Sequence, residues 1–386
     1  HMLKENKKNR KKCLFCFNSN IGFNKQTVKN NSLLCKSNES NLEDYLINSK
    51  PMINGEEVKH SQVILELKKI INTKEIFHID GLSCDIQSIS KVLNFAEKKK
   101  YSINHIDGKR INNFYESFQK YGGSFASFNE IKNRSDLMIF LNISEDEICL
   151  EFFEKLEWTR KKKKQSIFFF NSNQKQSDEF SHISYKEGSF FEELNYLNID
   201  NKERRIKKKF EGLKKKFEKA NFPVVLCNIE ENNNAEILSI YSLIKLINKK
   251  NRLRIYNFLG SNNSSGYTNA CVTKTGYPNS INFTERGSEY EPDEIRPESL
   301  KEYIKFQIYI SNFEENPKLN FFKNNIFIGN PNFINKNKTQ LFIPTKTPGI
   351  DCSGLVVRPD GIGVIKLNKK IDSDYPSLSE ILEDLM

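Results

Sequence analysis

Apolar and polar positions along the chain alternate between two patterns, one typical of buried strands and the other of amphipathic helices. Short apolar runs such as EIFHID and DLMIFLNI are bounded by polar residues. Between them, the segment GLSCDIQSISKVLNFAEKKK places Ile89, Val92 and Ala96 on one helical face at spacings of three and four. Uninterrupted apolar strands that alternate with such helices indicate a parallel sheet covered on both faces, so the sequence predicts an α/β fold.

A charged stretch, NKERRIKKKFEGLKKKFEKA, separates two such α/β runs. Its apolar residues form a narrow stripe, which predicts a surface helix with a wide cationic face. The second run contains FPVVLCNI, AEILSIYSLIKLINKK and RLRIYNFLG, and it ends with apolar strands, a hairpin that turns at Asp360-Gly361 and a short helix. We therefore predict three regions: a small Cys-bearing N-terminal lobe (1–60), an α/β domain (61–220), and a second α/β domain with C-terminal strands and a hairpin (221–386).

The composition favours a folded protein of a reducing compartment. The chain has 386 residues, and its 30 Phe and 14 Tyr supply enough apolar area for a core, which excludes full disorder. No apolar run approaches the ~20 residues of a membrane span, and the first residues, HMLKENKKNRKK, lack the apolar region of a secretory signal. The eight Cys stand mostly alone within apolar runs. We therefore expect a cytoplasmic location.

The net charge of +11 favours an anionic partner without saying which one. Nucleic acid, an acidic cofactor and an acidic protein subunit are all open, and so is compositional drift, because Lys, Asn, Ile and Phe are jointly abundant. No nucleic-acid-binding motif and no platform of aromatic and basic strand residues accompanies the charge. Nucleic acid is therefore not among the partners that we expect.

One loop and one group of cysteines are candidates for ligand binding. The loop from Gly260 to Gly266 (GSNNSSG) follows an apolar strand, which is where open α/β sheets bind ligands. It matches neither a P-loop nor a G-x-G-x-x-G fingerprint, and an ordinary turn is the alternative. Cys13, Cys16 and Cys35 offer three of the four ligands that zinc or an iron–sulfur cluster normally needs.

The histidines encode no catalytic centre. None of the five forms an H-x-H or H-E-x-x-H motif, which excludes the usual zinc hydrolase site. His78 and His105 stand at predicted strand ends, where we expect a structural, hydrogen-bonded role. No G-x-S-x-G nucleophile elbow is present either. We therefore assign no catalytic residue.

Four segments follow one another in an order that resembles a known family. They are EIFHIDGLSCDIQSISKVLNFAEKKKYSINHIDG (75–108), EIKNRSDLMIF (130–140), LGSNNSSGYTNACVTKTGYPNSINFTERG (259–287) and IPTKTPGIDCSGLVVRPDG (343–361). Together they resemble the B subunit of formylmethanofuran dehydrogenase, and most closely its tungsten-free counterpart in the formyltransferase/hydrolase complex of methylotrophs. The resemblance implies the Rossmann-like parallel-sheet domains of molybdopterin oxidoreductases, with a small N-terminal Cys-bearing lobe.

The departures from this family bear on its cofactors. The family's cluster-binding cysteines are matched by Cys13 and Cys16, but Asn20 stands at the third position and Cys35 falls near the fourth. The segment HIDGKRIN, which begins at His105, has no Cys where the dehydrogenases place a ligand for tungsten or molybdenum. The resemblance therefore implies the family fold without tungsten, molybdenum or an intact iron–sulfur cluster.

The resemblance further implies a non-catalytic subunit, structural or coenzyme-binding, of a formyltransferase/hydrolase complex. Such a complex converts formyl groups, carried on a tetrahydromethanopterin-type carrier and a methanofuran analogue, to formate. The partners would be a formyltransferase subunit and an amidohydrolase-like subunit. Because arginine pairs bidentately with carboxylates, we expect cations near the Gly260–Gly266 loop to hold the polyglutamyl tail of a methanofuran-type coenzyme. The residues predicted to bind it are Arg254, Asn262, Asn263, Gly266, Lys274 and Arg286.

Two other functions stay open at this point. The first is an active molybdo- or tungstopterin formylmethanofuran dehydrogenase subunit with atypical metal ligands. The second is a basic nucleic-acid-binding protein, for which the charge is the sole argument.

Overall fold

The computed structural model divides the chain into two compact units. Of the described residues, unit 1 comprises 113–259, and unit 2 comprises 49–112 together with 260–386. The predicted cysteine lobe, with Cys13, Cys16 and Cys35, lies outside the residues that the structure describes. The described residues are 49–143, 153, 156, 166–172, 180–186, 189–197, 208–227, 234–249, 251–256, 259–260, 262–295, 297–300, 302–314, 317, 322 and 324–386.

Unit 2 is built on a nine-stranded sheet with the order β12-β11-β4-β3-β13-β14-β15-β1-β2. The five strands from β4 to β15 in that order are parallel, whereas β11 and β1 join them antiparallel at the two sides. Every residue of β3 and β13 is buried, as their apolar runs predict. The bounds are Met52–Ile53 (β1), Glu56–Glu57 (β2), Phe77–Ser83 (β3), Ser102–Ile103 (β4), Ile281–Thr284 (β11), Gly287–Tyr290 (β12), Phe306–Ser311 (β13), Asn324–Gly329 (β14) and Leu341–Pro344 (β15).

A β-bulge near the end of β3 sets the position of the residues that follow it. Leu82 has no partner on β13, because Gly81 and Ser83 pair with consecutive residues of that strand. Gly81 and Leu82 both have positive φ angles, 85° and 51°. A Cβ at position 81 would lie 2.6 Å from the Tyr309 ring, so this close approach requires glycine. The predicted strand EIFHID therefore continues through the bulge to Ser83.

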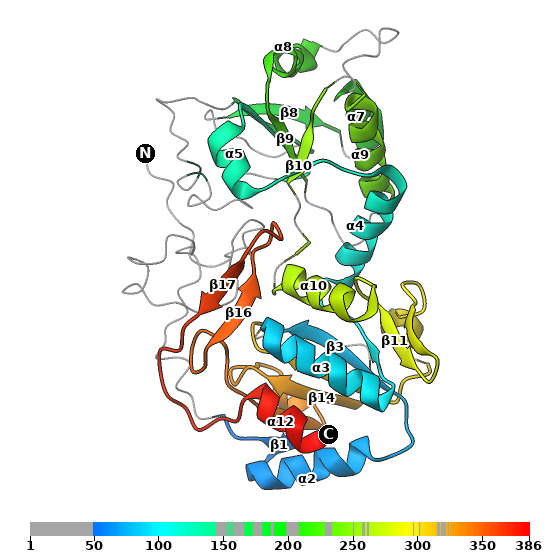
Figure 1. Ribbon diagram of the computed structural model, residues 1–386, viewed down its shortest axis with the longest axis vertical. Helices are drawn as coiled ribbons and strands as arrows, with labels where there is room; N and C mark the ends of the chain where they lie inside the picture. The colour runs from blue at the N-terminus through cyan, green and yellow to red at the C-terminus, as the bar shows by residue number, and fades with distance from the viewer. Residues whose placement is uncertain are drawn as a thin grey trace. The chain divides into compact units, whose positions relative to one another are not determined.

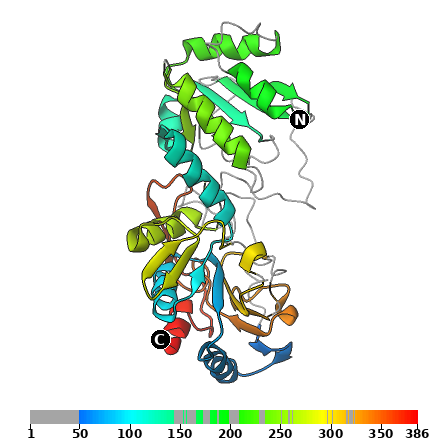
Figure 2. The same ribbon diagram turned by 90° about the vertical axis from the view of Figure 1, so that its right-hand side faces the viewer.

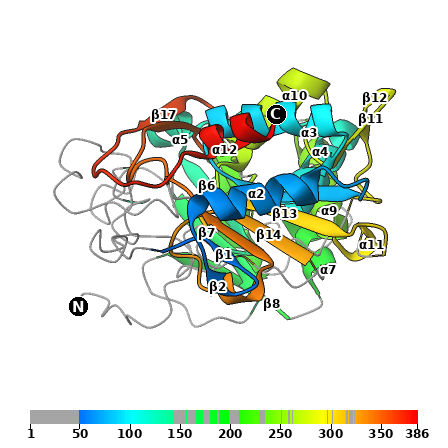
Figure 3. The same cartoon turned by 90° about the horizontal axis from the view of Figure 1, so that it is seen from below.

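Helices and one hairpin accompany this sheet (Figure 1). Asp85 is the N-cap of the helix α3, and its carboxylate accepts from the backbone N–H of Gln87 and Ser88. It contacts α10 and α12, and Figure 3 shows α12 and α3 from below, together with α2. The predicted hairpin is confirmed as the antiparallel pair β16 and β17. The bounds are His60–Ile71 (α2), Ile86–Lys99 (α3), Ser264–Thr275 (α10), Pro297–Leu300 (α11), Leu378–Leu385 (α12), Gly354–Val357 (β16) and Val364–Leu367 (β17).

Unit 1 contains a six-stranded sheet, β5-β10-β9-β6-β7-β8, in which all neighbouring strands are parallel. In Figure 2, α9 lies across these strands. Phe210, Leu213 and Phe217, from the apolar stripe predicted in the charged stretch, are buried in the core. The strands are Phe125–Ala126 (β5), Leu137–Leu141 (β6), Ser166–Ser172 (β7), Ser181–Tyr185 (β8), Pro223–Cys227 (β9) and Arg254–Tyr256 (β10). The helices are Gly108–Tyr121 (α4), which the division between the units crosses, Phe128–Arg134 (α5), Phe190–Leu194 (α7), Glu211–Lys219 (α8) and Asn234–Ile247 (α9), with the 3-10 turns Asn195–Leu197 (η4) and Lys208–Phe210 (η5).

The predicted α/β class is confirmed by these two sheets, one wholly and one partly parallel. The helix predicted to end at Gly122 does so, because α4 stops at Tyr121 and Gly122 takes a positive φ of 71°. Within the part of the chain that the structure describes, no helix is long and apolar enough to cross a membrane.

Candidate functional site

The candidate site lies at the carboxyl edge of the unit 2 sheet, where β4 ends and α10 begins. Residues Asn104 to Gly108 follow β4 directly, and the Gly260–Gly266 loop leads into α10. Open α/β sheets bind their ligands at this edge. The structure therefore places the predicted loop where a ligand would be expected, and the side chains around it decide whether space is left for one.

Asn279 is the centre of a buried hydrogen-bond network at this edge. Its side chain is fully buried. Its Oδ1 accepts from the backbone N–H of His105 (3.1 Å) and from the Tyr267 hydroxyl (2.9 Å). Its Nδ2 donates to Asn104 Oδ1 (2.8 Å) and to the Gly108 carbonyl (3.2 Å). One amide thus joins the segment after β4 to α10.

His105 and Asp107 extend this network to the loop. His105 Nδ1 accepts from the backbone N–H of Asp107 (3.0 Å), which assigns the proton to Nε2, and Nε2 donates to the Asn262 carbonyl (3.4 Å). The Ser264 hydroxyl donates to Asp107 Oδ2 (2.7 Å). Burial lowers the pKa of His105 to about 3, so the imidazole is neutral. The predicted structural role of His105 agrees with this geometry. We call this set the polar network; its members are Asn104, His105, Asp107, Asn262, Ser264, Tyr267 and Asn279.

Asn263 ties the same loop to two further segments. It has a left-handed backbone, with a φ of 61°. Its Nδ2 donates to the Cys84 carbonyl (2.9 Å), and its Oδ1 accepts from the Val357 N–H in β16 (2.9 Å). The Ser265 hydroxyl donates to the Pro359 carbonyl (3.1 Å). The Asn263 and Ser265 side chains therefore bind backbone groups of neighbouring segments.

Glycines let the backbone approach these side chains closely. A Cβ at Gly260 would lie 2.5 Å from Asp107 Cγ, and one at Gly266 would lie 2.3 Å from Asn263 Oδ1. A Cβ at Gly108 would lie 2.2 Å from Asn104 Oδ1. The glycines that made this loop look like a ligand cradle thus provide room for protein side chains, so this edge of the sheet is filled by the protein itself.

The thiols near this edge are held in their neutral form. Burial raises the pKa of Cys84 well above its usual range, and the neighbouring Asp85 carboxylate raises it further. Burial also raises the pKa of Cys271 to about 12. A protonated thiol is a poor nucleophile and a poor metal ligand. Among the residues that the structure describes, no three His, Cys, Asp or Glu side chains are grouped as for a metal ion.

The three cations predicted to hold a coenzyme tail belong to three different elements. Lys274, near the end of α10, binds Glu97 (2.6 Å), and Arg286, in the turn between β11 and β12, lies 3.4 Å from Glu289. Arg254 belongs to unit 1, at the start of β10. The other predicted residues, Asn262, Asn263 and Gly266, lie in or beside the polar network.

Asn279 and Tyr267 were missed by the sequence reasoning. Neither belongs to a spacing motif, and the bonds that join them to each other and to His105 span 12 and 174 residues of the chain. The one usable signal was the polar segment directly after β4, since polar residues at the carboxyl end of a parallel strand face the edge where segments converge. That signal points to His105 and Asp107 but not to the amide that joins them to α10.

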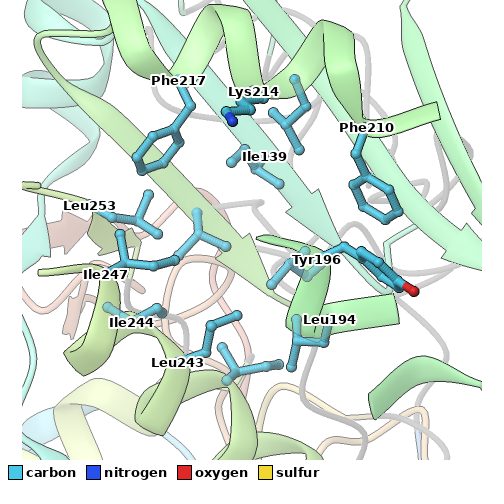
Figure 4. A pocket seen from close by; sticks show the side chains of 14 residues that line it. Ile139, Leu194, Tyr196, Phe210, Lys214, Phe217, Leu243, Ile244, Ile247 and Leu253 are labelled. Carbon is cyan, nitrogen blue, oxygen red and sulfur yellow. The ribbon is translucent and has the colours of Figure 1, made fainter. Parts of the chain in front are cut away.

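Unit 1 contains an apolar pocket between its sheet, α8 and α9 (Figure 4). Fourteen residues line it, among them Ile139, Phe217 and Ile244, and Lys214 is the charged one. The cavity measures about 20 Å³, little more than one water molecule needs. A space of this size and lining is a small packing gap in the core rather than a site for a coenzyme.

Comparison with known proteins bears on the fold. No protein-family model matches the chain, and no curated protein matches it in sequence. By structure it is similar to a chain of the formyltransferase/hydrolase complex FhcABCD from Methylorubrum extorquens, solved in complex with methylofuran. The TM-score is 0.75 at 12% sequence identity, and the match covers 87% of this chain and 97% of that chain. The α/β fold with parallel-sheet segments that the sequence resemblance implies is confirmed, while the N-terminal lobe lies outside the described residues. With 87% of the chain covered, the similarity includes both units.

Proposed function

We propose that the chain is a non-catalytic subunit of a formyltransferase/hydrolase complex that releases formyl groups as formate. The observation that carries this proposal is the filled carboxyl edge of the unit 2 sheet. The Asp107 side chain occupies the space beside Gly260. In the same way, Asn104 lies beside Gly108, and Asn263 lies beside Gly266. A ligand at this edge would have to displace a buried network whose polar atoms satisfy one another, at a cost of several hydrogen bonds.

The chemistry of the edge supports the same proposal. A catalytic site needs groups whose pKa values lie near the working pH, and nucleophiles that are activated. Here burial moves the pKa of His105 far below that range and those of Cys84 and Cys271 above it. Each group is therefore held neutral and unreactive. The segment that begins at His105, where the resemblance implies a metal ligand in the dehydrogenases, serves the polar network instead.

The coenzyme-binding part of the proposal concerns the surface cations. FhcABCD was solved with methylofuran, which supports a furan-type coenzyme as the ligand of such a complex. Arg286 is the most accessible of the predicted cations, since 86% of its side chain is exposed. Lys274 is already bound by Glu97 and Asn94. We therefore assign the tail's carboxylates first to Arg286 within this proposal, with Lys274 as a secondary contact.

The experiment that tests the proposal is purification of the chain from its native source, with identification of the chains that accompany it. We expect an amidohydrolase-like and a formyltransferase chain, with no tungsten or molybdenum by mass spectrometry. Either metal at about one per chain would favour an active dehydrogenase subunit and contradict the non-catalytic assignment. Recovery of nucleic acid that stays bound at ~150 mM salt would contradict it as well.

A further inference from the structure

Two arginines of unit 1 lie over the same aromatic ring at the amino ends of parallel strands. Arg254 begins β10, Arg134 ends α5, and Phe222 stands directly before β9. The Cζ atom of Arg254 lies 3.8 Å from the centroid of the Phe222 ring, and that of Arg134 lies 4.6 Å from it. The ring is buried and holds both guanidiniums near one another by stacking and cation–π attraction.

The carboxylates near this pair are already engaged with backbone groups. Glu130 Oε2 accepts from the Ser127 backbone N–H (2.9 Å) and hydroxyl (3.0 Å), which closes the N-terminal capping box of α5. The Asp136 carboxylate accepts from the N–H groups of Asn221 (2.6 Å) and Phe222 (2.9 Å). No carboxylate oxygen of the described residues lies within 4.0 Å of a nitrogen of either arginine.

Among the described residues, the two guanidiniums therefore have no close counter-ion. The pKa of Arg254 is lowered, first by partial burial and then by repulsion from Arg134, while Glu130 opposes the shift from farther away. One N–H group of the Arg254 guanidinium donates to the Arg252 carbonyl (2.9 Å), and this hydrogen bond fixes the orientation of the guanidinium. Its other N–H groups can donate to a ligand. An anion placed here would relieve the repulsion.

We propose that Arg134 and Arg254, on the Phe222 ring, form a clamp for neighbouring carboxylates of an acidic peptide chain. Each guanidinium presents a planar fork that matches one carboxylate, so two on the same ring match two carboxylates of one chain. The clamp lies at the amino ends of β9 and β10, the edge opposite to the one where α/β sheets bind cofactors. It fits an acidic segment of a partner protein or the polyglutamyl tail of a coenzyme. The clamp does not depend on the proposed function, because it uses contacts within unit 1 alone.

The test is binding of a fluorescent hexaglutamate peptide to the purified full chain, followed by anisotropy. Arg134→Gln and Arg254→Gln are each expected to weaken binding at least about tenfold, because each removes a bidentate, charge-assisted contact. Lys338→Gln is the control: it removes one positive charge from an exposed side chain of unit 2 that has no role in either proposal, and it should leave the affinity unchanged. Phe222→Leu, which keeps an apolar side chain but removes the ring, should weaken binding less than either arginine variant.

Three results would overturn the clamp. The first is an equal loss in Lys338→Gln, which would reduce the effect to net charge. The second is unchanged binding in both arginine variants, and the third is tighter binding of inorganic pyrophosphate than of the peptide. Comparison of α-linked with γ-linked hexaglutamate separates the two sources: preference for the α-linked peptide assigns the clamp to a protein segment, and preference for the γ-linked one to a coenzyme tail. Because the isolated chain is used, failure here leaves the co-purification result of the proposed function unaffected.

Discussion

The two units treat their polar side chains in opposite ways. Unit 2 buries them: Asn279 and His105 are almost inaccessible, and the His105 backbone N–H donates to the Asn279 side-chain oxygen. Unit 1 keeps its core apolar, and among the described residues no carboxylate contacts Arg134 or Arg254. A satisfied buried network makes a rigid structure, whereas a charge held in place without a counter-ion is available to bind. Protein side chains therefore occupy the edge that the sequence predicts for a ligand, whereas the clamp that we propose belongs to unit 1.

The contrast is a matter of donors and acceptors rather than of the amount of polarity. In unit 2 the Asn279 amide offers both kinds of group and meets both, so nothing is left over. An arginine has donors only and cannot satisfy another arginine. The stability of unit 2 should therefore depend steeply on small chemical changes in the polar network, and that of unit 1 should depend little on its rim arginines.

The largest effect is expected from Asn279→Asp, which changes one NH2 group to oxygen. The new oxygen would face Asn104 Oδ1 and the Gly108 carbonyl, both acceptors, at about 3 Å. A buried charge opposite acceptors should lower the free energy of unfolding by about 4 kcal/mol. Urea denaturation followed by circular dichroism measures this. The matched control is Asn269→Asp on the exposed side of α10, expected to change stability by less than about 0.5 kcal/mol. Equal losses of stability in Asn279→Asp and Asn269→Asp would show that the stability of unit 2 does not depend on the NH2 group of Asn279.

The alternation of strands and helices could be read from the sequence because burial imposes it locally. Apolar runs such as those of β13 and β14 are buried whatever their neighbours, and the Asp360-Gly361 turn needs only local backbone preferences. Which strands pair could not be read in this way. β3 lies against β13, more than 200 residues later, and nothing in either run selects the other. That choice depends on the packing of the whole unit.

The position of the candidate site could be predicted from the sequence, but the groups that surround it could not. A polar, glycine-containing loop after a strand indicates the carboxyl edge of a sheet, and Asn262 and Asn263 do lie there. Whether such a loop surrounds a ligand or protein side chains depends on partners that are remote in sequence. Asn263 is bound by the Cys84 carbonyl and the Val357 N–H, which are 179 and 94 residues away. No local pattern contains that information.

A smaller effect is expected when one of the close glycine contacts is blocked. Gly260→Ala would place a methyl group 2.5 Å from Asp107 Cγ at a φ of +129°, so unit 2 should lose about 3 kcal/mol. Gly276→Ala is the matched control, since its φ of +82° is also left-handed but nothing lies within 4 Å of the added carbon. It should cost about 1 kcal/mol. Thermal unfolding measures the stability of both variants. A similar loss of stability in Gly260→Ala and Gly276→Ala would show that backbone strain, rather than the contact with Asp107, accounts for the effect.

The smallest effect is the pH dependence of unit 2, which arises from two buried imidazoles. Burial lowers the pKa of both His78 and His105 to about 3, against an ordinary value of 6.5. Between these values the unfolded chain binds more protons than the folded one, so stability falls as the pH is lowered from about 6.5 towards 3. Each histidine should cost about 1 kcal/mol between pH 7 and 5.5. Hydrogen exchange should show this loss in peptides of β3 and β4.

The contribution of each histidine is isolated by replacing it, because other groups also titrate. Burial raises the pKa of Asp85, so this carboxyl group gives a slope of opposite sign, and the native profile shows only the sum. In His78→Gln the difference in unfolding free energy between pH 7 and 5.5 should fall by about 1 kcal/mol, whatever the variant's absolute stability. His60→Gln, at a half-exposed helix start, should change it much less. If the unfolding free energy of His78→Gln changed with pH as that of the native chain does, protonation of His78 would not contribute to the loss of stability at low pH. The stability of unit 2 would then depend less on its buried polar side chains than we expect.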